Sequence, residues 1–259
     1  MTESSSLLQT HQLDVSIGNV EVCKSLDWTI KRGEHWGILG LNGIGKTTLL
    51  NTLAGLHKSF YGNIKVLGKE IKTYTANELA VQIAYLLQSM PHDFPMSVEE
   101  FCQGSLNSRL GRWQLIDQSV DDLINEALRG VQMETFKQRT MQKLSGGERR
   151  RIEIAGVLLQ DPTIWLLDEP TNHLDLHQQR AMMKLLIDHV NTNNGCSISI
   201  LHDPNLAVRY CTHILLLQGN GQWQLGNRDD MLTTENLSQL YQHKICKVTD
   251  NNGTLFIAE

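Results

Sequence analysis

Two short motifs in this sequence could each hold phosphate groups with backbone N–H donors. Residues 40–48 read GLNGIGKTT and match the phosphate-loop pattern G-x-x-x-x-G-K-[ST]. Residues 144–148 read LSGGE, with a serine and two glycines at the expected start of a helix. Glycine-rich turns and helix N-termini both direct N–H groups at anions. Together the motifs predict that the chain binds and hydrolyses a nucleoside triphosphate.

The first motif has the sequence context that a phosphate loop requires. It follows an apolar, strand-like run (36–40) and precedes an apolar, helix-like stretch that starts near Lys46. We expect Lys46 to reach the β- and γ-phosphates, Thr47 to bind Mg²⁺ and Thr48 to bond a phosphate oxygen. A glycine-rich turn with a surface lysine is the alternative. The residues predicted to contact phosphate are Gly40, Leu41, Asn42, Gly43, Ile44, Gly45, Lys46, Thr47 and Thr48.

Two carboxylates, Asp168 and Glu169, end a second apolar run, residues 163–168. Nucleotides bind at the carboxyl ends of strands in parallel sheets, and a buried carboxylate without a partner there would be costly. Asp168 is therefore predicted to hold Mg²⁺ through water, and Glu169 to be the base that orients or deprotonates the attacking water. Two solvated acids after a strand are the alternative, which the phosphate loop disfavours.

The LSGGE motif predicts a capped helix that something approaches closely. Ser145 is placed as the N-cap residue with Glu148 three positions on, a capping-box arrangement. Gly146 and Gly147 would weaken the first turn unless a close neighbour requires them. The arginines that follow, at positions 149–151, are expected to be solvated or salt-bridged rather than bound to nucleic acid.

Composition excludes several classes of protein. The chain has 259 residues, 41% hydrophobic and 20% charged, with a net charge of −5, so we expect a globular protein without a nucleic-acid partner. Its apolar runs are too short to cross a bilayer, and its N-terminus does not resemble a secretory signal. The five scattered cysteines fit free thiols in a reducing cytoplasm.

The elements that must position these motifs can be read from hydrophobic patterning. Three apolar runs without alternation (36–40, 163–168 and 197–201) predict strands buried on both faces of a parallel sheet. Residues 11–34 alternate, as in a half-exposed antiparallel layer. The predicted division is an α/β core of residues 1–88 and 160–227, a helical insertion of residues 89–159, and a C-terminal extension of residues 228–259 with a capped helix near 234–241.

These motifs make the chain resemble, over nearly its whole length, the nucleotide-binding subunit of an ATP-binding cassette (ABC) transporter. The resemblance implies one nucleotide-binding domain over residues 1–259, with a P-loop NTPase (RecA-like) core, an antiparallel β subdomain and an inserted helical subdomain. It also implies ATP and Mg²⁺ as ligands and a head-to-tail homodimer. In that dimer Ser145, Gly146 and Gly147 of one chain would close on ATP held by the other chain.

The resemblance assigns roles to four more residues. Gln88 would contact the Mg²⁺ and water site and link it to the membrane partner, and His202 would bond the γ-phosphate. Asp175 would contact the opposite subunit; capping the following helix is its alternative role. Ile17 stands where the family often places an aromatic ring against adenine, so stacking worth about 1 kcal/mol would be lost and nucleotide selectivity could be loose.

Three segments resemble the ABC family that imports iron–siderophore complexes, haem and cobalamin: residues 172–179, 201–217 and 226–241. That resemblance implies a separate integral-membrane permease, to which this chain would bind as a peripheral subunit at the cytoplasmic face of the bacterial inner membrane. It also implies, indirectly, an extracytoplasmic substrate-binding protein. Another ABC importer, or a soluble regulatory ABC ATPase, is the alternative.

The permease is expected to dock just after Gln88. Met90, Phe94 and Met96 lie there in a proline-punctuated loop and could contact a permease helix. Phe101 is expected to pack within the helical insertion instead.

Overall fold

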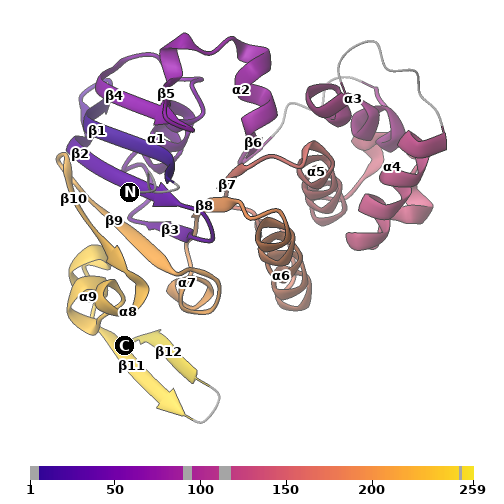
Figure 1. Cartoon of the computed structure of the whole chain (residues 1–259). Helices are drawn as coiled ribbons and strands as arrows, with labels where there is room; N and C mark the ends of the chain where they lie inside the picture. Colours follow the sequence, from indigo (N-terminus) through magenta and orange to yellow (C-terminus); the bar gives the residue numbers. More distant parts are fainter. Residues whose placement is uncertain (1–5, 90–94, 111–117, 251–252) are drawn as a thin grey trace.

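A computed structural model describes residues 6–89, 95–110, 118–250 and 253–259. Two sheets form its larger part (Figure 1). The first is antiparallel with strand order β2-β1-β4-β5, made of β1 (Ser6–Ile17), β2 (Val20–Lys31), β4 (Phe60–Val66) and β5 (Lys69–Glu70). Buried and exposed residues alternate along much of β2, which confirms the predicted half-exposed antiparallel layer.

The second sheet carries the predicted parallel strands. Its order is β10-β9-β3-β8-β7-β6, and all neighbours from β9 to β6 are parallel, whereas β10 is an antiparallel edge strand. All residues of β3, β7 and β8 are buried, as their unbroken apolar sequences predict. The strands are β3 (His35–Leu39), β6 (Ile83–Leu86), β7 (Ile164–Asp168), β8 (Cys196–Ile200), β9 (His213–Gly219) and β10 (Gln222–Asn227).

Helices fill the connections between strands. Those of the two-sheet part are α1 (Lys46–Leu53), η1 (Ile71–Thr73), α2 (Ala76–Gln82), α6 (Leu176–Thr192) and α7 (Pro204–Tyr210). Between β6 and β7 lie α3 (Val98–Leu110), α4 (Gln118–Gly130), η2 (Glu134–Phe136), η3 (Met141–Lys143) and α5 (Gly146–Gln160). In Figure 1, α3 and α4 lie at the end of the molecule farthest from the antiparallel sheet. The domain boundaries placed around these elements remain predictions.

Three buried clusters hold these layers together. One lies between the two sheets and contains Trp28 and Trp36, whose rings meet edge to face. A second joins the other face of the central sheet to the helices α3–α6. The stripe predicted on α4 enters it, with Ile124 and Leu128 fully buried.

The third cluster seats the C-terminal elements on β9 and α7. These elements are α8 (Arg228–Met231), α9 (Thr234–Tyr241), β11 (Ile245–Asp250) and β12 (Gly253–Ala258). Thr233 caps α9, as expected for that segment. The β11–β12 hairpin projects from the molecule in Figure 1.

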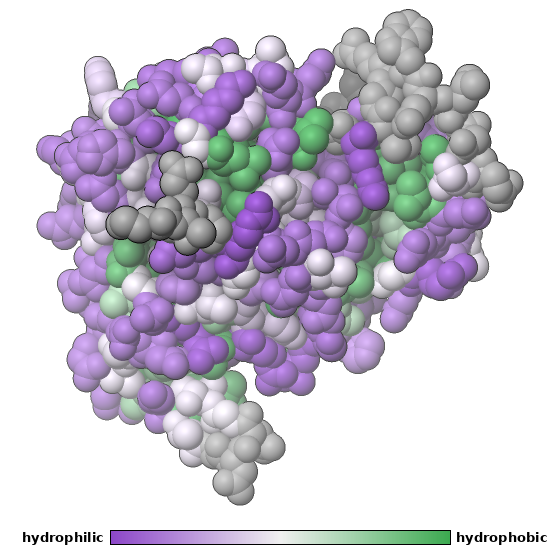
Figure 2. Space-filling model, viewed as in Figure 1, coloured by the Kyte–Doolittle hydropathy of each residue, from purple (hydrophilic) through white to green (hydrophobic). Residues whose placement is uncertain are grey.

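Membrane-spanning helices are absent from the described ranges, where no helix combines the needed length and apolarity. In Figure 2 the visible face is mainly hydrophilic, and hydrophobic residues reach it in small separate areas, one of them over α3 and α4.

Candidate functional site

The loop from Gly40 to Gly45 joins β3 to α1 and has the geometry of an anion cradle. Gly45, the N-cap of α1, has φ 99°, and a Cβ there would lie 2.3 Å from a methyl carbon of Val22. Gly43 also has a positive φ of 77°, and a Cβ on Gly40 would lie 2.8 Å from the Leu217 carbonyl oxygen. No side chain caps the N-terminus of α1, so its N–H groups are available to an anion.

Lys46 begins α1 and lies folded over the loop. It is 6% exposed, and its ammonium group donates to the carbonyl oxygens of Gly40 (2.8 Å) and Leu41 (2.9 Å). Burial lowers the pKa of Lys46, and the nearby carboxylates of Glu169 and Asp168 oppose that shift. The ammonium group is therefore held where a phosphate on the loop would meet it. Thr47 and Thr48 follow in the first turn of α1, beside the same loop.

Asp168 ends β7 as a buried carboxylate that fits a metal site. The residue is fully buried, and neither carboxylate oxygen has a hydrogen-bond partner among the described residues. Burial raises the pKa of Asp168, although the hydroxyl of Thr47 lies close enough to lower it in part. An unpartnered buried carboxylate is costly, and Mg²⁺ prefers oxygen ligands of this kind. The carboxylate of Asp168 and the hydroxyl of Thr47 thus suit the predicted Mg²⁺.

Glu169 brings together the loops that follow three neighbouring strands. Its Oε1 accepts hydrogen bonds from Gln88 Nε2 (3.0 Å), after β6, and from His202 Nε2 (2.6 Å), after β8. Its Oε2 accepts one from Asn172 Nδ2 (2.9 Å). The Glu169 backbone has φ 48°, a left-handed conformation that costs a non-glycine residue about 1–3 kcal/mol. The structure therefore gathers Gln88, Glu169 and His202 at one point.

The LSGGE segment forms the predicted capping box at the start of α5. The Ser145 hydroxyl accepts from the Glu148 N–H (3.3 Å), and the Glu148 carboxylate accepts from the Ser145 N–H (2.8 Å). A Cβ on Gly147 would lie 2.9 Å from the His173 carbonyl oxygen of the same chain. The close neighbour predicted for these glycines is thus, at Gly147, a residue of the same chain. A Cβ on Gly146 would make only an ordinary van der Waals contact.

The two phosphate-binding motifs do not meet within one chain. In Figure 1 the strands β7 and β8 lie between α1 and α5. Asp175 is exposed and caps α6, its carboxylate accepting from the Gln178 N–H at 2.8 Å. That capping role is the one expected from the residue alone, and it leaves the predicted contact with another subunit untested.

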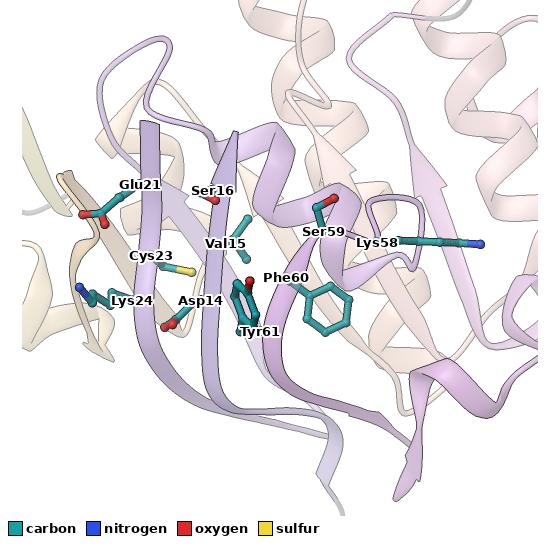
Figure 3. A pocket seen from close by; sticks show the side chains of 10 residues that line it. All are labelled: Asp14, Val15, Ser16, Glu21, Cys23, Lys24, Lys58, Ser59, Phe60 and Tyr61. Atoms are coloured by element: carbon teal, nitrogen blue, oxygen red, sulfur yellow. The ribbon is translucent and has the colours of Figure 1, made fainter. Parts of the chain in front are cut away.

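Ile17 ends β1 with half of its surface exposed (50%), and Val20 across the turn is 40% exposed. An aliphatic surface, not an aromatic ring, is therefore presented at the position predicted to face adenine. A separate cavity of about 620 Å³ opens beside β1, β2 and β4 (Figure 3). It includes none of the predicted site residues, and burial raises the pKa of its Cys23 thiol to about 12, so that thiol is not reactive at neutral pH.

Two residues of the site were missed in the sequence analysis. Asn172 contacts Glu169 from three residues downstream, and its place in a turn directly after the carboxylate pair is the signal that could have found it. Arg150, expected to be solvated or salt-bridged, is salt-bridged to Glu153 (2.8 Å) but is also buried. No periodic signal distinguishes it from the arginines on either side.

The predicted docking loop lies partly outside the described residues. Met90 and Phe94 fall outside them. Met96 is half-buried and packs against the helical cluster, as Phe101 does. The packing expected for Phe101 is confirmed, whereas Met96 offers less free surface than expected.

Known proteins resemble this chain over nearly its whole length. The family model described as ABC transporter matches residues 23–172. The ferric enterobactin transport ATP-binding protein FepC of Escherichia coli (strain K12) is 31% identical over 255 residues, which cover 97% of this chain and 92% of FepC. The hemin import ATP-binding protein HmuV of Bradyrhizobium diazoefficiens is 31% identical over 246 residues, covering 92% of this chain and 89% of HmuV.

Solved structures agree with this similarity. A chain assigned to a metal-chelate type ABC transporter, in an inward-facing conformation, aligns with a TM-score of 0.83 at 26% identity over 98% of both chains. The protein cbiO1 from Clostridium perfringens, part of the ABC transporter complex cbiONQ, aligns with a TM-score of 0.75 at 27% identity over 90% of this chain and 93% of cbiO1. With a family model spanning the phosphate loop, the LSGGE motif and the Glu169 turn, this chain belongs to the ABC transporter family as an ATP-binding subunit, and it is an ATPase.

Proposed function

We propose that this subunit hydrolyses ATP to drive import of a metal chelate: an iron–siderophore complex, haem or cobalamin. The observation that carries the catalytic part is the convergence of Gln88, His202 and Asn172 on the carboxylate of Glu169, beside the buried Asp168. The cargo class is supported by relatives named for ferric enterobactin transport and hemin import, and by a metal-chelate type structure that aligns over 98% of the chain.

In this proposal each residue has a separate task. The loop 40–48, with Lys46, binds the phosphates. Thr47 and Asp168 would hold Mg²⁺, which would neutralise phosphate charge. Glu169 orients the attacking water and accepts its proton. Its three hydrogen-bond donors hold the carboxylate in place until a water takes one of their positions. His202 is 46% exposed and can turn from Glu169 to a γ-phosphate.

A homodimer would complete the site. The separation of α1 from α5 in one chain supports an arrangement in which Ser145 of the partner subunit closes on ATP held by this chain's phosphate loop. The capping box engages the Glu148 N–H and fixes the start of α5, and the N–H groups of Gly146 and Gly147 in its first turn would bind the phosphate.

The permease would dock beside Gln88, at the cytoplasmic face of the membrane. An apolar groove of about 190 Å³ lies between the end of α1, α2 and β6, and Leu56, Leu79, Ile83 and Tyr85 are among its lining residues. Leu56 is 64% exposed there. Because β6 lines this groove and continues to Gln88, an apolar permease helix in it would contact the strand that carries Gln88, which supports the groove over the half-buried Met96 as the main contact.

Reconstituted import tests the cargo assignment. The subunit would be purified with its permease, placed in liposomes with its binding protein, and supplied with ATP and ferric siderophore, haem or cobalamin. We expect ATP-dependent uptake of one of these chelates. ATP hydrolysis without uptake of any of them, together with uptake of a cargo of another class, would contradict metal-chelate import and favour another importer.

A further inference from the structure

Arg150 is a buried cation that contacts the chain at the ends of strands β6 and β7, beside the proposed catalytic residues. It lies in the second turn of α5 and is 3% exposed. Its Nη1 donates to the carbonyl oxygen of Leu87 (2.6 Å), and its Nη2 donates to those of Asp168 (2.6 Å) and Glu169 (2.9 Å). Its Nε donates to the carbonyl oxygen of Pro170 at 3.3 Å. All three nitrogens of the guanidinium group are therefore engaged with backbone.

The charge of this guanidinium group is balanced locally. Glu153, one turn further along α5 and 5% exposed, accepts from Arg150 Nη1 at 2.8 Å. A buried ion requires both a counter-ion and satisfied hydrogen bonds, and Arg150 has both. The fixed planar fork of arginine suits several acceptors at once, which a single ammonium group on a flexible stem does not.

Three of the four carbonyl groups that Arg150 binds belong to the turn that orients Glu169. Glu169 is left-handed, with φ 48°, and such a residue persists only where its surroundings hold it. Its carbonyl oxygen accepts from Arg150 and from the Asn172 N–H (3.1 Å). Arg150 also holds the carbonyl groups on either side of Glu169. The fork thus fixes three consecutive peptide units around the proposed base.

The same fork reaches the neighbouring strand. Leu87, whose carbonyl group binds Arg150, directly precedes Gln88, and Gln88 donates to the carboxylate of Glu169. Arg150 lies on α5, five residues after Ser145, which caps the same helix. One side chain therefore links the start of α5, the Glu169 turn and the strand end that carries Gln88.

We propose that Arg150 is a positioning residue for hydrolysis: it sets the orientation of Glu169 relative to Gln88 and ties that orientation to α5. This inference rests on the proposed role of Glu169 as the catalytic base. It gives Arg150 no contact with ATP. Loss of its fork should accordingly lower turnover and leave nucleotide affinity almost unchanged.

The Arg150→Lys substitution tests this with its neighbour as the control. Lysine keeps the charge beside Glu153 but cannot span four carbonyl groups. Arg151 donates to the carbonyl oxygens of Val131 and Gln132, both at 3.2 Å and both just after α4, so Arg151→Lys makes the same chemical change away from Glu169. We expect Arg150→Lys to lower kcat about 10- to 100-fold, as a small misplacement of a catalytic group does. Its Kd for ATP should stay within about threefold, and Arg151→Lys should keep kcat within about threefold.

A double-variant comparison separates positioning from general stability. The folded fraction of each chain is measured by circular dichroism, and kcat is expressed per folded protein. In the Glu169→Gln background, adding Arg150→Lys should cause no further loss of residual hydrolysis, because Arg150 acts through Glu169. A further loss as large as in the native background, or a fall in kcat that only follows the folded fraction, would overturn the proposal.

Two other results have distinct meanings. Near-native ATP turnover by Glu169→Gln would show that Glu169 is not the base, and the inference about Arg150 would then be wrong as well. If Glu169→Gln abolishes turnover but Arg150→Lys keeps native turnover, only the inference about Arg150 is wrong. If Arg150→Lys does not fold, the double variant Arg150→Gln/Glu153→Gln, which removes both charges of the buried ion pair, is measured in the same way. Failure of both chains to fold would overturn the proposal in favour of a purely structural role.

Discussion

The carboxylates at the end of β7 have opposite environments although they are adjacent in sequence. Asp168 is fully buried with neither oxygen hydrogen-bonded among the described residues, whereas Glu169 accepts three hydrogen bonds from side chains of three loops. Burial raises the pKa of Asp168. The environment of Asp168 suits a metal ligand. The environment of Glu169 suits a catalytic base whose orientation is fixed by hydrogen bonds.

Asp168→Asn should therefore stabilise the protein in the absence of nucleotide and Mg²⁺. It removes a buried charge, and we expect the free energy of unfolding at pH 7 to rise by about 1–3 kcal/mol. The pKa of Asp168 is higher in the folded chain than in an unfolded one, so the native protein should lose stability relative to the variant as pH rises through the interval between the two values.

Chemical denaturation at several pH values measures this difference. Adding ATP and Mg²⁺ should reverse it, because only the native chain retains the carboxylate. A variant that is less stable than the native chain without ligand would contradict the assignment of Asp168 as an unpartnered carboxylate.

Among the secondary-structure elements, the hydrophobic pattern predicted the strands and helices whose residues are buried in the core. The buried strands β3, β7 and β8 follow from unbroken apolar runs, and α4 follows from a stripe at helical spacing. The pairing of Arg150 on α5 with four carbonyl groups depends instead on contacts with residues distant in sequence. No local pattern encodes such contacts, which is why the sequence analysis missed them.

The loop between β3 and α1 allows a prediction about its glycines. Gly45→Ala would place a methyl group 2.3 Å from Val22 in a left-handed residue, whereas Gly43→Ala meets nothing within 4 Å and incurs only the backbone strain. Gly43→Ala should cost about 1–2 kcal/mol of stability, and Gly45→Ala should cost more and abolish ATP binding. Thermal unfolding and nucleotide titration of both variants measure this. Equal effects would contradict the packing of the loop against β2.

In the whole molecule, the two-sheet part carries the phosphate loop proposed to bind nucleotide, and the helices between β6 and β7 carry the LSGGE motif. The groove beside α2 lies where the chain passes from the first part to the second. A permease bound there would contact the strand that leads to Gln88. In the proposed docking, that strand would link transport to hydrolysis.

Leu56→Glu should weaken permease binding without affecting ATP binding. A charge in the apolar groove should reduce association by about 1–3 kcal/mol, as expected for an interface anchor. Leu255→Glu, on the exposed face of the distant C-terminal hairpin and 49% exposed, is the matched control. Pull-down of the permease in detergent compares them, and equal capture of both variants would remove this groove from the docking model.

We propose that Glu169 is the base of an ATPase whose sites form between two chains. The most direct test measures ATP binding, ATP turnover and oligomeric state in Glu169→Gln. We expect native ATP affinity, turnover lowered at least about 100-fold, and a dimer that persists on size exclusion with ATP and Mg²⁺, because Lys46, Thr47 and Asp168 remain while the base is lost. Near-native turnover, or a chain that stays monomeric with ATP bound, would contradict it.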